Sequence, residues 1–292
     1  MLQQESTLEK RLERPIFSAD WRRGRGLFRQ ALSILAFLLA WQLVSMTGLF
    51  GRYPRELMGL FLPSPLHLLK TVAEVVANGS LLKHVGFSCY RVVSGFAIAT
   101  LIGIPAGLLM SYSRSAEQFL NPFVRLFQPI PGVAWVPLAI IWFGLGNKAA
   151  VFIITMGAIF PIILSTAQGV RDVDPNLVGA ALTLGASKLQ VFEKVILPSI
   201  TPHLVTGFRL AMGFAWRVLL AAEMVGVSSG LGYMLTLGRG TGRTDITLLT
   251  MVVIGAIMVA MDSAVFSPLE NKTAAWRPRL SKERAEEDEI RG

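Results

Sequence analysis

The chain has 292 residues, of which 52% are apolar and only 16% are charged. In soluble globular domains about a quarter of the residues are charged, and disordered chains are poor in apolar residues. The composition therefore excludes both classes. The formal net charge is +9, but Lys and Arg crowd into the two ends of the chain, which is typical of a membrane surface rather than of a nucleic-acid groove. We therefore expect an integral membrane protein with no nucleic-acid partner.

Six stretches are long and apolar enough to cross a hydrocarbon core of about 30 Å, which takes roughly 20 helical residues. They cover residues 27–50, 88–110, 124–144, 149–170, 203–225 and 246–266. Prolines 129, 131 and 137 interrupt the third stretch. We expect an all-α membrane protein with six transmembrane helices, divided into an N-terminal tail (1–26), a transmembrane domain (27–266) and a C-terminal tail (267–292).

Two local patterns lie near the second stretch. Ser64-Pro65 favours the start of a helix and Asn78-Gly79 favours its end, which predicts a short amphipathic helix at the membrane face, followed by a second helix that leads into the span. Within the span, Gly103 and Gly107 form a pattern of two small residues four apart. That pattern suits close helix packing, either inside the chain or against a second copy.

The orientation follows from the distribution of Lys and Arg around the spans. With the N-terminus in the cytoplasm, most of these residues lie on the cytoplasmic side, chiefly because of the two tails. Six spans then place the C-terminus in the cytoplasm too, along with the loop after the fourth span.

That loop, residues 171–202, has an organisation unusual for a membrane connector. Asp174-Pro175 favours a helix start, because Asp accepts backbone N–H groups and Pro fits the first helical position. Apolar residues then recur at steps of four and three up to Ile196, which predicts one continuous helix. Pro198 and Pro202 are expected to end this helix before the fifth span.

The loop resembles the signature loop of ABC importer permeases, in which E-A-A is followed after three residues by Gly and after nine more by I-x-L-P. Here Gly179-Ala180-Ala181, Gly185 and residues 195–198 (VILP) hold these positions with matching spacing, although Gly179 replaces the leading Glu. Residues 61–69, 128–144 and 221–235 also resemble the nitrate, sulfonate and taurine type of permease. The resemblance covers about residues 58–275.

The resemblance implies a permease core whose loop forms a coupling helix on a separate cytoplasmic ABC ATPase. It implies a transport subunit rather than an enzyme. It also implies a second permease subunit as partner, in a homodimer in the bacterial inner membrane. An extracytoplasmic solute-binding protein would deliver a small oxyanion such as nitrate, taurine or an alkanesulfonate. The residues that correspond to the coupling loop are Gly179, Ala180, Ala181, Gly185, Leu189, Leu197 and Pro198.

No cofactor is expected on this chain. It lacks the phosphate-binding pattern G-x-x-x-x-G-K-[ST], so ATP and Mg²⁺ belong to the ATPase partner. One cysteine, Cys89, and three histidines leave little material for a metal centre. No catalytic residue is expected either.

Charged residues inside the spans are candidates for the translocation path, since each costs roughly 3 kcal/mol or more at the bilayer centre. Arg217 and Glu223 of the fifth stretch either pair with one another or face the path. Gln128 and Trp135, beside the prolines of the third stretch, are further candidates, because a broken helix frees backbone groups that line a cavity or are buried in protein. Arg125, Arg209 and Asp262 are expected to reach the membrane interfaces.

Two other classes of protein compete with this interpretation. Gly226-x-Ser228-x-Gly230 matches the nucleophile motif of hydrolases, but no histidine follows it in the chain. A secondary transporter would show an inverted repeat with paired broken helices, and only one Pro-broken span is found. An ABC importer permease is therefore the predicted class.

Overall fold

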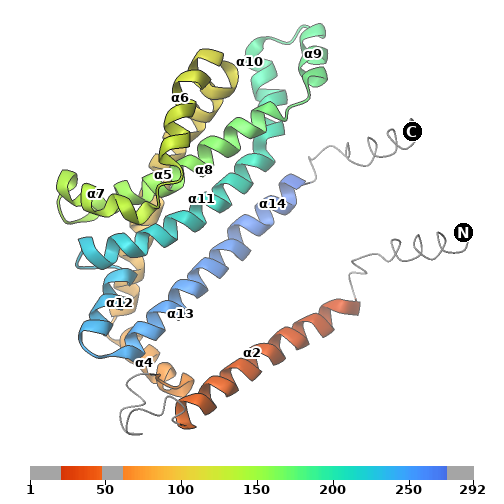
Figure 1. Cartoon of the computed structure of the whole chain (residues 1–292). Coiled ribbons are helices and arrows are strands. Elements are labelled where there is room, and N and C mark those ends of the chain that lie inside the picture. Colours follow the sequence, from red (N-terminus) through yellow and green to blue (C-terminus); the bar gives the residue numbers. More distant parts are fainter. Residues whose placement is uncertain (1–20, 48–61, 275–292) are drawn as a thin grey trace, which may run out of the picture. The chain divides into compact units, whose positions relative to one another are not determined.

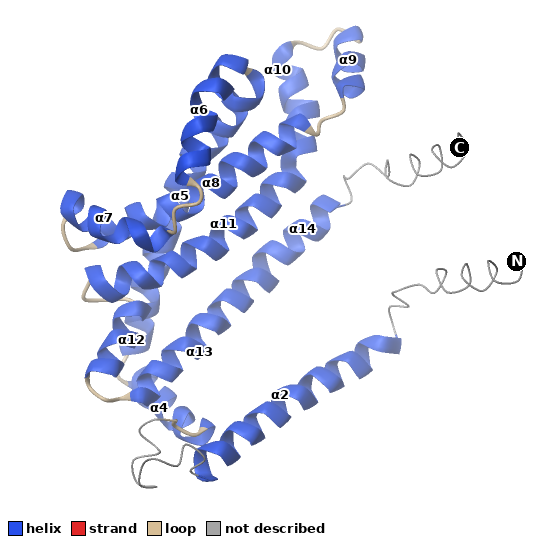
Figure 2. Ribbon diagram, in the orientation of Figure 1, coloured by secondary structure: helices blue, strands red, loops and turns tan. Residues whose placement is uncertain are grey.

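The computed structural model describes residues 21–47 and 62–274, and all regular elements of these residues are helices (Figures 1 and 2). This confirms the predicted all-α class. The chain divides into two units, residues 1–70 and 71–292.

The first unit contains α2 (Trp21–Thr47) and the beginning of α4 (Pro65–Ala77). The apolar part of α2 that the structure describes in detail is Leu32–Met46, shorter than a full span. Helix α4 starts and stops as the sequence predicts. Ser64 Oγ accepts the N–H of His67 at 3.2 Å, and Gly79 follows the helix with φ of 71°.

The second unit contains the remaining helices. They are α5 (Ser80–Tyr112), α6 (Arg114–Phe127), α7 (Val136–Phe143), α8 (Asn147–Arg171), α9 (Pro175–Thr183), α10 (Lys188–Val191), α11 (Leu197–Gly226), α12 (Leu231–Gly240), α13 (Thr244–Met261) and α14 (Ser267–Ala274). Short 3₁₀ and π turns join some of them: Gly132–Trp135 precedes α7, Phe192–Ile196 joins α10 to α11, and Asp262–Phe266 joins α13 to α14.

Among the residues that the structure describes, four helical segments are long and apolar enough to cross a membrane: Ser80–Tyr112, Asn147–Arg171, Lys188–Gly226 and Thr244–Thr273. The pair α6 and α7 bends by 94° and makes a fifth if it counts as one span. The bend falls at residues 128–131, where Pro129 and Pro131 cannot continue a regular helix. Pro137 is tolerated because it lies in the first turn of α7. The expected count of six spans stays a prediction.

Helices α5, α8 and α11 build the core of the second unit. Glycines let α5 approach α8 closely, since a methyl group at Gly107 would lie 2.6 Å from the carbonyl oxygen of Ile163, and one at Gly103 would lie 2.9 Å from Ile162. Of the two uses left open for these glycines, the structure shows packing within the chain.

Successive long helices run in alternating directions, so their ends gather at two opposite ends of this bundle. Helices α5 and α8 end, and α11 begins, near α9 and α10, whereas α7 and α12 lie at the opposite end (Figure 1). We call these the α9 end and the α12 end.

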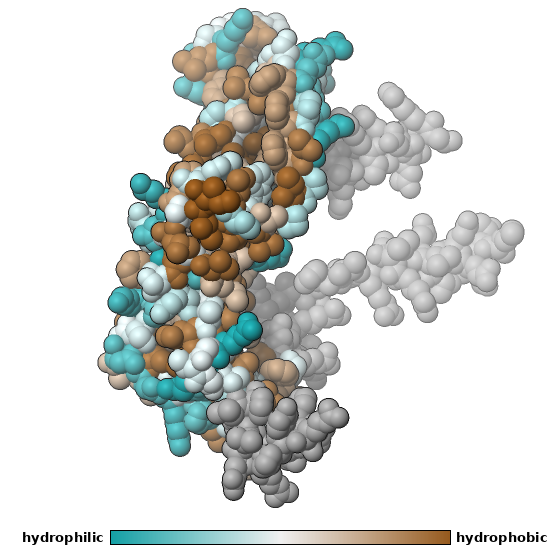
Figure 3. Space-filling model, turned by 60° about the vertical axis from the view of Figure 1, so that its left-hand side comes forward, coloured by the Kyte–Doolittle hydropathy of each residue, from teal (hydrophilic) through white to brown (hydrophobic). Residues whose placement is uncertain are grey.

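Apolar side chains cover much of the middle of the face drawn in Figure 3. Many large apolar side chains are exposed; Leu101 and Val259, for example, are 75% and 68% exposed. Such a surface suits lipid or a protein partner.

At the α12 end, Arg243 anchors α4 to the start of α13. Its guanidinium lies 2.8 Å from Asp245 and 2.9 Å from Glu74, and Asp245 also accepts the Thr71 hydroxyl at 2.8 Å. The hydrogen bonds to Asp245 and then Glu74 raise the pKa of Arg243. The part of α4 that belongs to this unit is thereby held to α13 by charge, and its Val75 is buried.

Candidate functional site

The loop between α8 and α11 forms two short helices, and we call residues 174–191 the coupling segment. Helix α9 begins as predicted, with Asp174 accepting the N–H of Asn176 at 2.8 Å. It ends in a Schellman motif: Ala186 N–H donates to Ala181 at 3.0 Å, and Gly185 takes a φ of 84°.

A second helix starts directly after this break. Ser187 and Gln190 form a capping box, in which Ser187 N–H donates to the Gln190 side chain at 2.8 Å and Gln190 N–H donates to Ser187 Oγ at 3.3 Å. The prediction of one continuous helix from residue 175 to 196 is therefore wrong. The apolar period runs through the loop, but the left-handed glycine and the capping box decide the local backbone.

The expected helix end at Pro198 and Pro202 is also wrong. The chain runs as one helical segment from Lys188 to Gly226. The π turn Phe192–Ile196 lies directly before Pro198 and widens the helix there, with Leu197 N–H bonded to Phe192 five residues back. Both prolines lie in the first two turns of α11, where neighbouring groups can satisfy the freed carbonyls.

The coupling segment has an anchored face and an exposed face. Val178, Ala181, Ala186 and Val191 pack in a cluster with the start of α11. On the other face, leucines project outward, with Leu184 at 88% and Leu189 at 65% exposure. Of the residues predicted to form this surface, Gly179, Ala180, Gly185, Leu189 and Leu197 are exposed, and Ala181 and Pro198 are half-buried.

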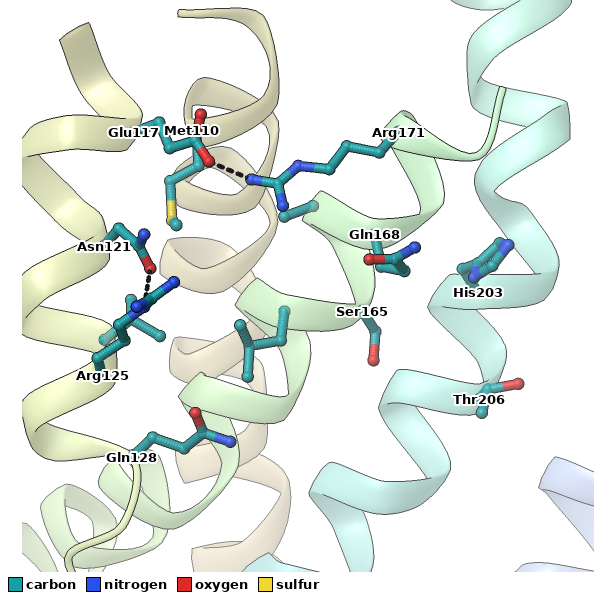
Figure 4. Close-up of a pocket in the computed structure, with 13 residues that line it drawn as sticks. Met110, Glu117, Asn121, Arg125, Gln128, Ser165, Gln168, Arg171, His203 and Thr206 are labelled. Atoms are coloured by element: carbon teal, nitrogen blue, oxygen red, sulfur yellow. Dashed lines mark hydrogen bonds and ion pairs between the residues drawn. The ribbon is translucent and has the colours of Figure 1, made fainter. Parts of the chain in front are cut away.

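Next to this segment, a cavity of about 550 Å³ opens between α5, α6, α8 and α11 (Figure 4). We call it the polar cavity, since most of its lining side chains are polar or charged. Those labelled in Figure 4 are Met110, Glu117, Asn121, Arg125, Gln128, Ser165, Gln168, Arg171, His203 and Thr206.

A second hollow of about 250 Å³ continues from it along α8 and α11. Its wall is apolar, with Ile130, Phe160, Phe214 and Val218. Gln128 lines both hollows, so this residue marks the boundary between the polar cavity and the apolar one.

At the α12 end, Arg91 and Glu223 form a fully buried ion pair with 2.6 Å between Nη1 and Oε1. Ser88 donates its hydroxyl to both carboxylate oxygens at 2.8 and 2.9 Å, and Gly232 N–H donates to Oε2 at 2.9 Å. The carboxylate thus lies at the N-terminus of α12, where a negative charge is favoured.

Arg91 extends the same cluster to two further parts of the chain. Its Nε donates to Asn147 at the start of α8 at 2.8 Å, and its Nη2 donates to the Ser229 hydroxyl at 2.6 Å. Both charges are therefore compensated by a partner and several hydrogen bonds, as a buried charge requires.

The predicted path residues have different surroundings. Gln128 lines the two cavities, as above. Arg217 is exposed and lies over the ring of Phe214 at 5.4 Å. Trp135 packs against Phe152, with ring centroids 6.2 Å apart, and lines neither cavity.

The possible pairing of Arg217 with Glu223 is not formed, because Glu223 is enclosed by Arg91, Ser88 and the start of α12. Arg91 was missed, although a charge inside an apolar stretch is the same signal that singled out Glu223. Ser229, not Ser228, is the serine held by this arginine.

Two of the charges expected at the membrane interfaces bind one another, and their position relative to a membrane stays a prediction. Arg209 donates to both oxygens of Asp262 at 2.7 and 2.8 Å and to Glu270 at 2.6 Å. About 40% of each of these side chains is exposed. They join α11 to the π turn Asp262–Phe266 and to α14. In the ranges 21–47 and 62–274, no group of three His, Cys, Asp or Glu residues could hold a metal ion.

Long apolar helices around a polar cavity, with an exposed helical segment at one end, define a multi-span membrane protein built for transport. Residues 99–267 match the family described as binding-protein-dependent transport system inner membrane component, and the chain belongs to this family. It is an ABC importer permease, and in this family the ATPase is a separate subunit.

Several relatives cover most of the chain. It is 37% identical to a putative ABC transporter permease of Methanocaldococcus jannaschii, over 77% of this chain and 88% of the relative. A putative aliphatic sulfonates transport permease of Bacillus subtilis is 31% identical, over 88% and 90%. The taurine transport system permease of Escherichia coli is 32% identical, over 74% and 80%.

A solved structure supports the fold. The inward-facing MetNI methionine ABC transporter aligns with a TM-score of 0.56 at 20% identity, over 68% of this chain and 97% of that one. At that identity the likeness speaks for the fold alone.

Proposed function

We propose that this chain is the permease of an importer for a small oxyanion of the alkanesulfonate, taurine or nitrate type. The observation that carries the proposal is the polar cavity, whose lining includes two arginines, two glutamines and hydroxyl groups. An anion that leaves water needs positive charge or hydrogen-bond donors in return. The names of the sulfonate and taurine relatives point to the same class of cargo.

The coupling segment is proposed to dock on the ATPase. Its leucines at positions 177, 182, 184 and 189 are at least 48% exposed on short helices anchored from behind. A rigid apolar surface of this kind can transmit a movement of the ATPase to α8 and α11, the two helices that line both cavities. ATP would bind to the partner only, and this chain would perform no covalent chemistry.

The assembly we propose holds two copies of this permease, two ATPase subunits and an extracytoplasmic binding protein in the bacterial inner membrane. Both termini and the α9 end would face the cytoplasm. The end of α14 lies at the α9 end of the bundle (Figure 1), which agrees with a coupling segment and a C-terminal tail on one side.

Reconstitution tests this function directly. The permease, its ATPase and the binding protein in liposomes should accumulate labelled taurine or ethanesulfonate when ATP is supplied on the ATPase side. Labelled choline, a cation of similar size, is the control cargo and should not accumulate. ATP-driven uptake of an uncharged or cationic solute in place of the anions would contradict the proposed cargo class.

A further inference from the structure

The charges around the polar cavity are not equally available. Arg171 is bound to Glu117 at 2.6 Å, so its charge is offset, and His203 lies 3.5 Å from Asp172. Arg125 is different. Its Nε donates to the neutral Asn121 at 3.2 Å, and it has no ion pair with any residue that the structure describes.

Uncharged donors lie around the same space. Gln128 caps the end of α6 three residues after Arg125 and keeps a right-handed helical backbone, so both side chains lie on the same side of this helix end. Figure 4 shows them extending toward α8. The side chains of Gln128 and Ser165 both line the cavity, and neither forms a side-chain hydrogen bond with the residues described. Two helices therefore present unused hydrogen-bonding groups beside an unneutralised guanidinium.

The position of this group along the bundle adds a second argument. Gln128 also lines the apolar hollow with Phe160 and Phe214. An anion in the apolar hollow has no charge to compensate it, and the first compensating groups toward the α9 end are Gln128 and then Arg125.

We propose that the polar cavity contains an oxyanion subsite, in which the Arg125 guanidinium supplies the charge and Gln128 and Ser165 supply hydrogen bonds. The ligand class is a singly charged oxyanion, with a sulfonate as the probe; the choice of sulfonate rests on the proposed function. A planar guanidinium can bind two oxygens of a sulfonate side by side, which an ammonium group cannot do.

A different role for Arg125 is to compensate the negative end of α6, since it lies in the last turn of that helix. In that role it would stabilise the helix but would not attract an anion into the cavity. The test must therefore measure the electrostatic potential inside the cavity and not only the uptake of substrate.

A cysteine at position 168 allows this potential to be measured. Gln168 is exposed and lines the cavity but is not one of the proposed ligands. In full-length protein carrying Cys89→Ser and Gln168→Cys, the thiol can be modified by two methanethiosulfonates, one with an ethanesulfonate group and one with a trimethylammonium group. The ratio of the two rates reports the local potential.

Arg125→Gln should lower the ratio of anionic to cationic modification about five-fold, as expected for one unit charge acting through water on reagents of opposite sign. Arg125→Lys should keep the ratio near the parent value. Arg114→Gln removes an exposed arginine from the same helix outside the cavity, and it should change the ratio little. Free ethanesulfonate should slow the anionic reagent in the parent but not in Arg125→Gln.

An unchanged ratio in Arg125→Gln, or an equal loss in Arg114→Gln, would overturn the subsite. Thermal unfolding of each purified variant shows whether α6 is intact, and Arg125→Met, which removes the charge but keeps a long side chain, repeats the test if Arg125→Gln is unstable. The result is separable from the proposed function. Arg125→Gln could lower the ratio of anionic to cationic modification while the reconstituted importer takes up no sulfonate. This result would support the subsite but contradict the proposed cargo.

Discussion

The Nη1 atom of Arg91 lies 2.6 Å from Oε1 of Glu223, and these side chains are only 1% and 0% exposed. The pair joins α5 to α11, and its hydrogen bonds reach α8 through Asn147 and the start of α12 through Gly232. Four helices of the bundle therefore meet at one pair of charges at the α12 end. The polar cavity, by contrast, lies at the α9 end, where the paired charged side chains are 36–48% exposed.

Glu223→Gln should destabilise the permease by about 3 kcal/mol, since removal of one partner leaves a buried charge uncompensated. The loss should show as a lower unfolding temperature of the purified protein in detergent. Arg217→Gln is the matched control on the same helix. Arg217 is exposed and contacts only the Phe214 ring among the interactions described here, so its loss should cost about 1 kcal/mol or less.

A double variant separates the charge from the packing. In Arg91→Gln with Glu223→Gln, no buried charge remains, and part of the lost stability should return. If the double variant is as unstable as the sum of the two single variants, the pair contributes no coupling. Normal stability of Glu223→Gln alone would contradict the buried pair itself.

Gly185 offers a test of why the coupling segment needs a glycine. Its φ is 84°, and apart from its two chain neighbours no described residue has a heavy atom within 4 Å of an added methyl group. The backbone therefore demands glycine, whereas small size matters only if the ATPase packs there. Asn tolerates the left-handed region better than Ala does, so Gly185→Asn should retain more co-purified ATPase than Gly185→Ala.

The opposite order would show that size at the interface governs position 185, because Ala is the smaller residue. Gly185→Trp should remain in the membrane and lose the ATPase in either case. Gly240→Ala is the control at the α12 end. Gly240 is helical and exposed, with no described neighbour within 4 Å of an added methyl group, so this change should leave co-purification intact.

Sequence patterns predicted the start of the coupling loop well, but its middle and its end poorly. Asp174-Pro175 acts within one turn, and such a signal is readable without tertiary structure. The apolar period across residues 178–196 predicts one helix, because periodicity does not show that Gly185 leaves the right-handed region. Ser187 and Gln190, three residues apart, carried the sign of a new helix start.

The buried pair of Arg91 and Glu223 could not be predicted from the sequence alone. Glu223 was recognised as costly in a span, but its partner is 132 residues away along the chain. Within one helix only Arg217 was available to pair with it. Which charge neutralises which is decided by helix packing between α5 and α11, and no local pattern specifies that packing.

The close approach of α5 to α8 predicts a strong effect of one methyl group. Gly107→Ala should lower the unfolding temperature by several degrees, because the new methyl would lie 2.6 Å from a backbone carbonyl of α8, which cannot rotate away. Gly86→Ala lies on the same helix with open space around it. It should be neutral or slightly stabilising, since Ala favours helix. Equal unfolding temperatures for the two variants would argue against the α5–α8 contact.

The last prediction concerns the side of the membrane that each end of the bundle faces. Asp172 follows α8 at the α9 end, and Thr241 follows α12 at the α12 end; both are exposed. One crossing by α11 separates them, so a membrane-impermeant thiol reagent should distinguish Asp172→Cys from Thr241→Cys in a Cys89→Ser background. In intact spheroplasts Thr241→Cys should react, and Asp172→Cys should react only after permeabilisation.

A reporter fused after Gly292 should report a cytoplasmic location, like one placed after Arg171. Labelling of both cysteines from the same side would mean that α11 does not cross. Labelling of Asp172→Cys from outside would place the coupling segment where no cytoplasmic ATPase could reach it, and the docking proposal would fail.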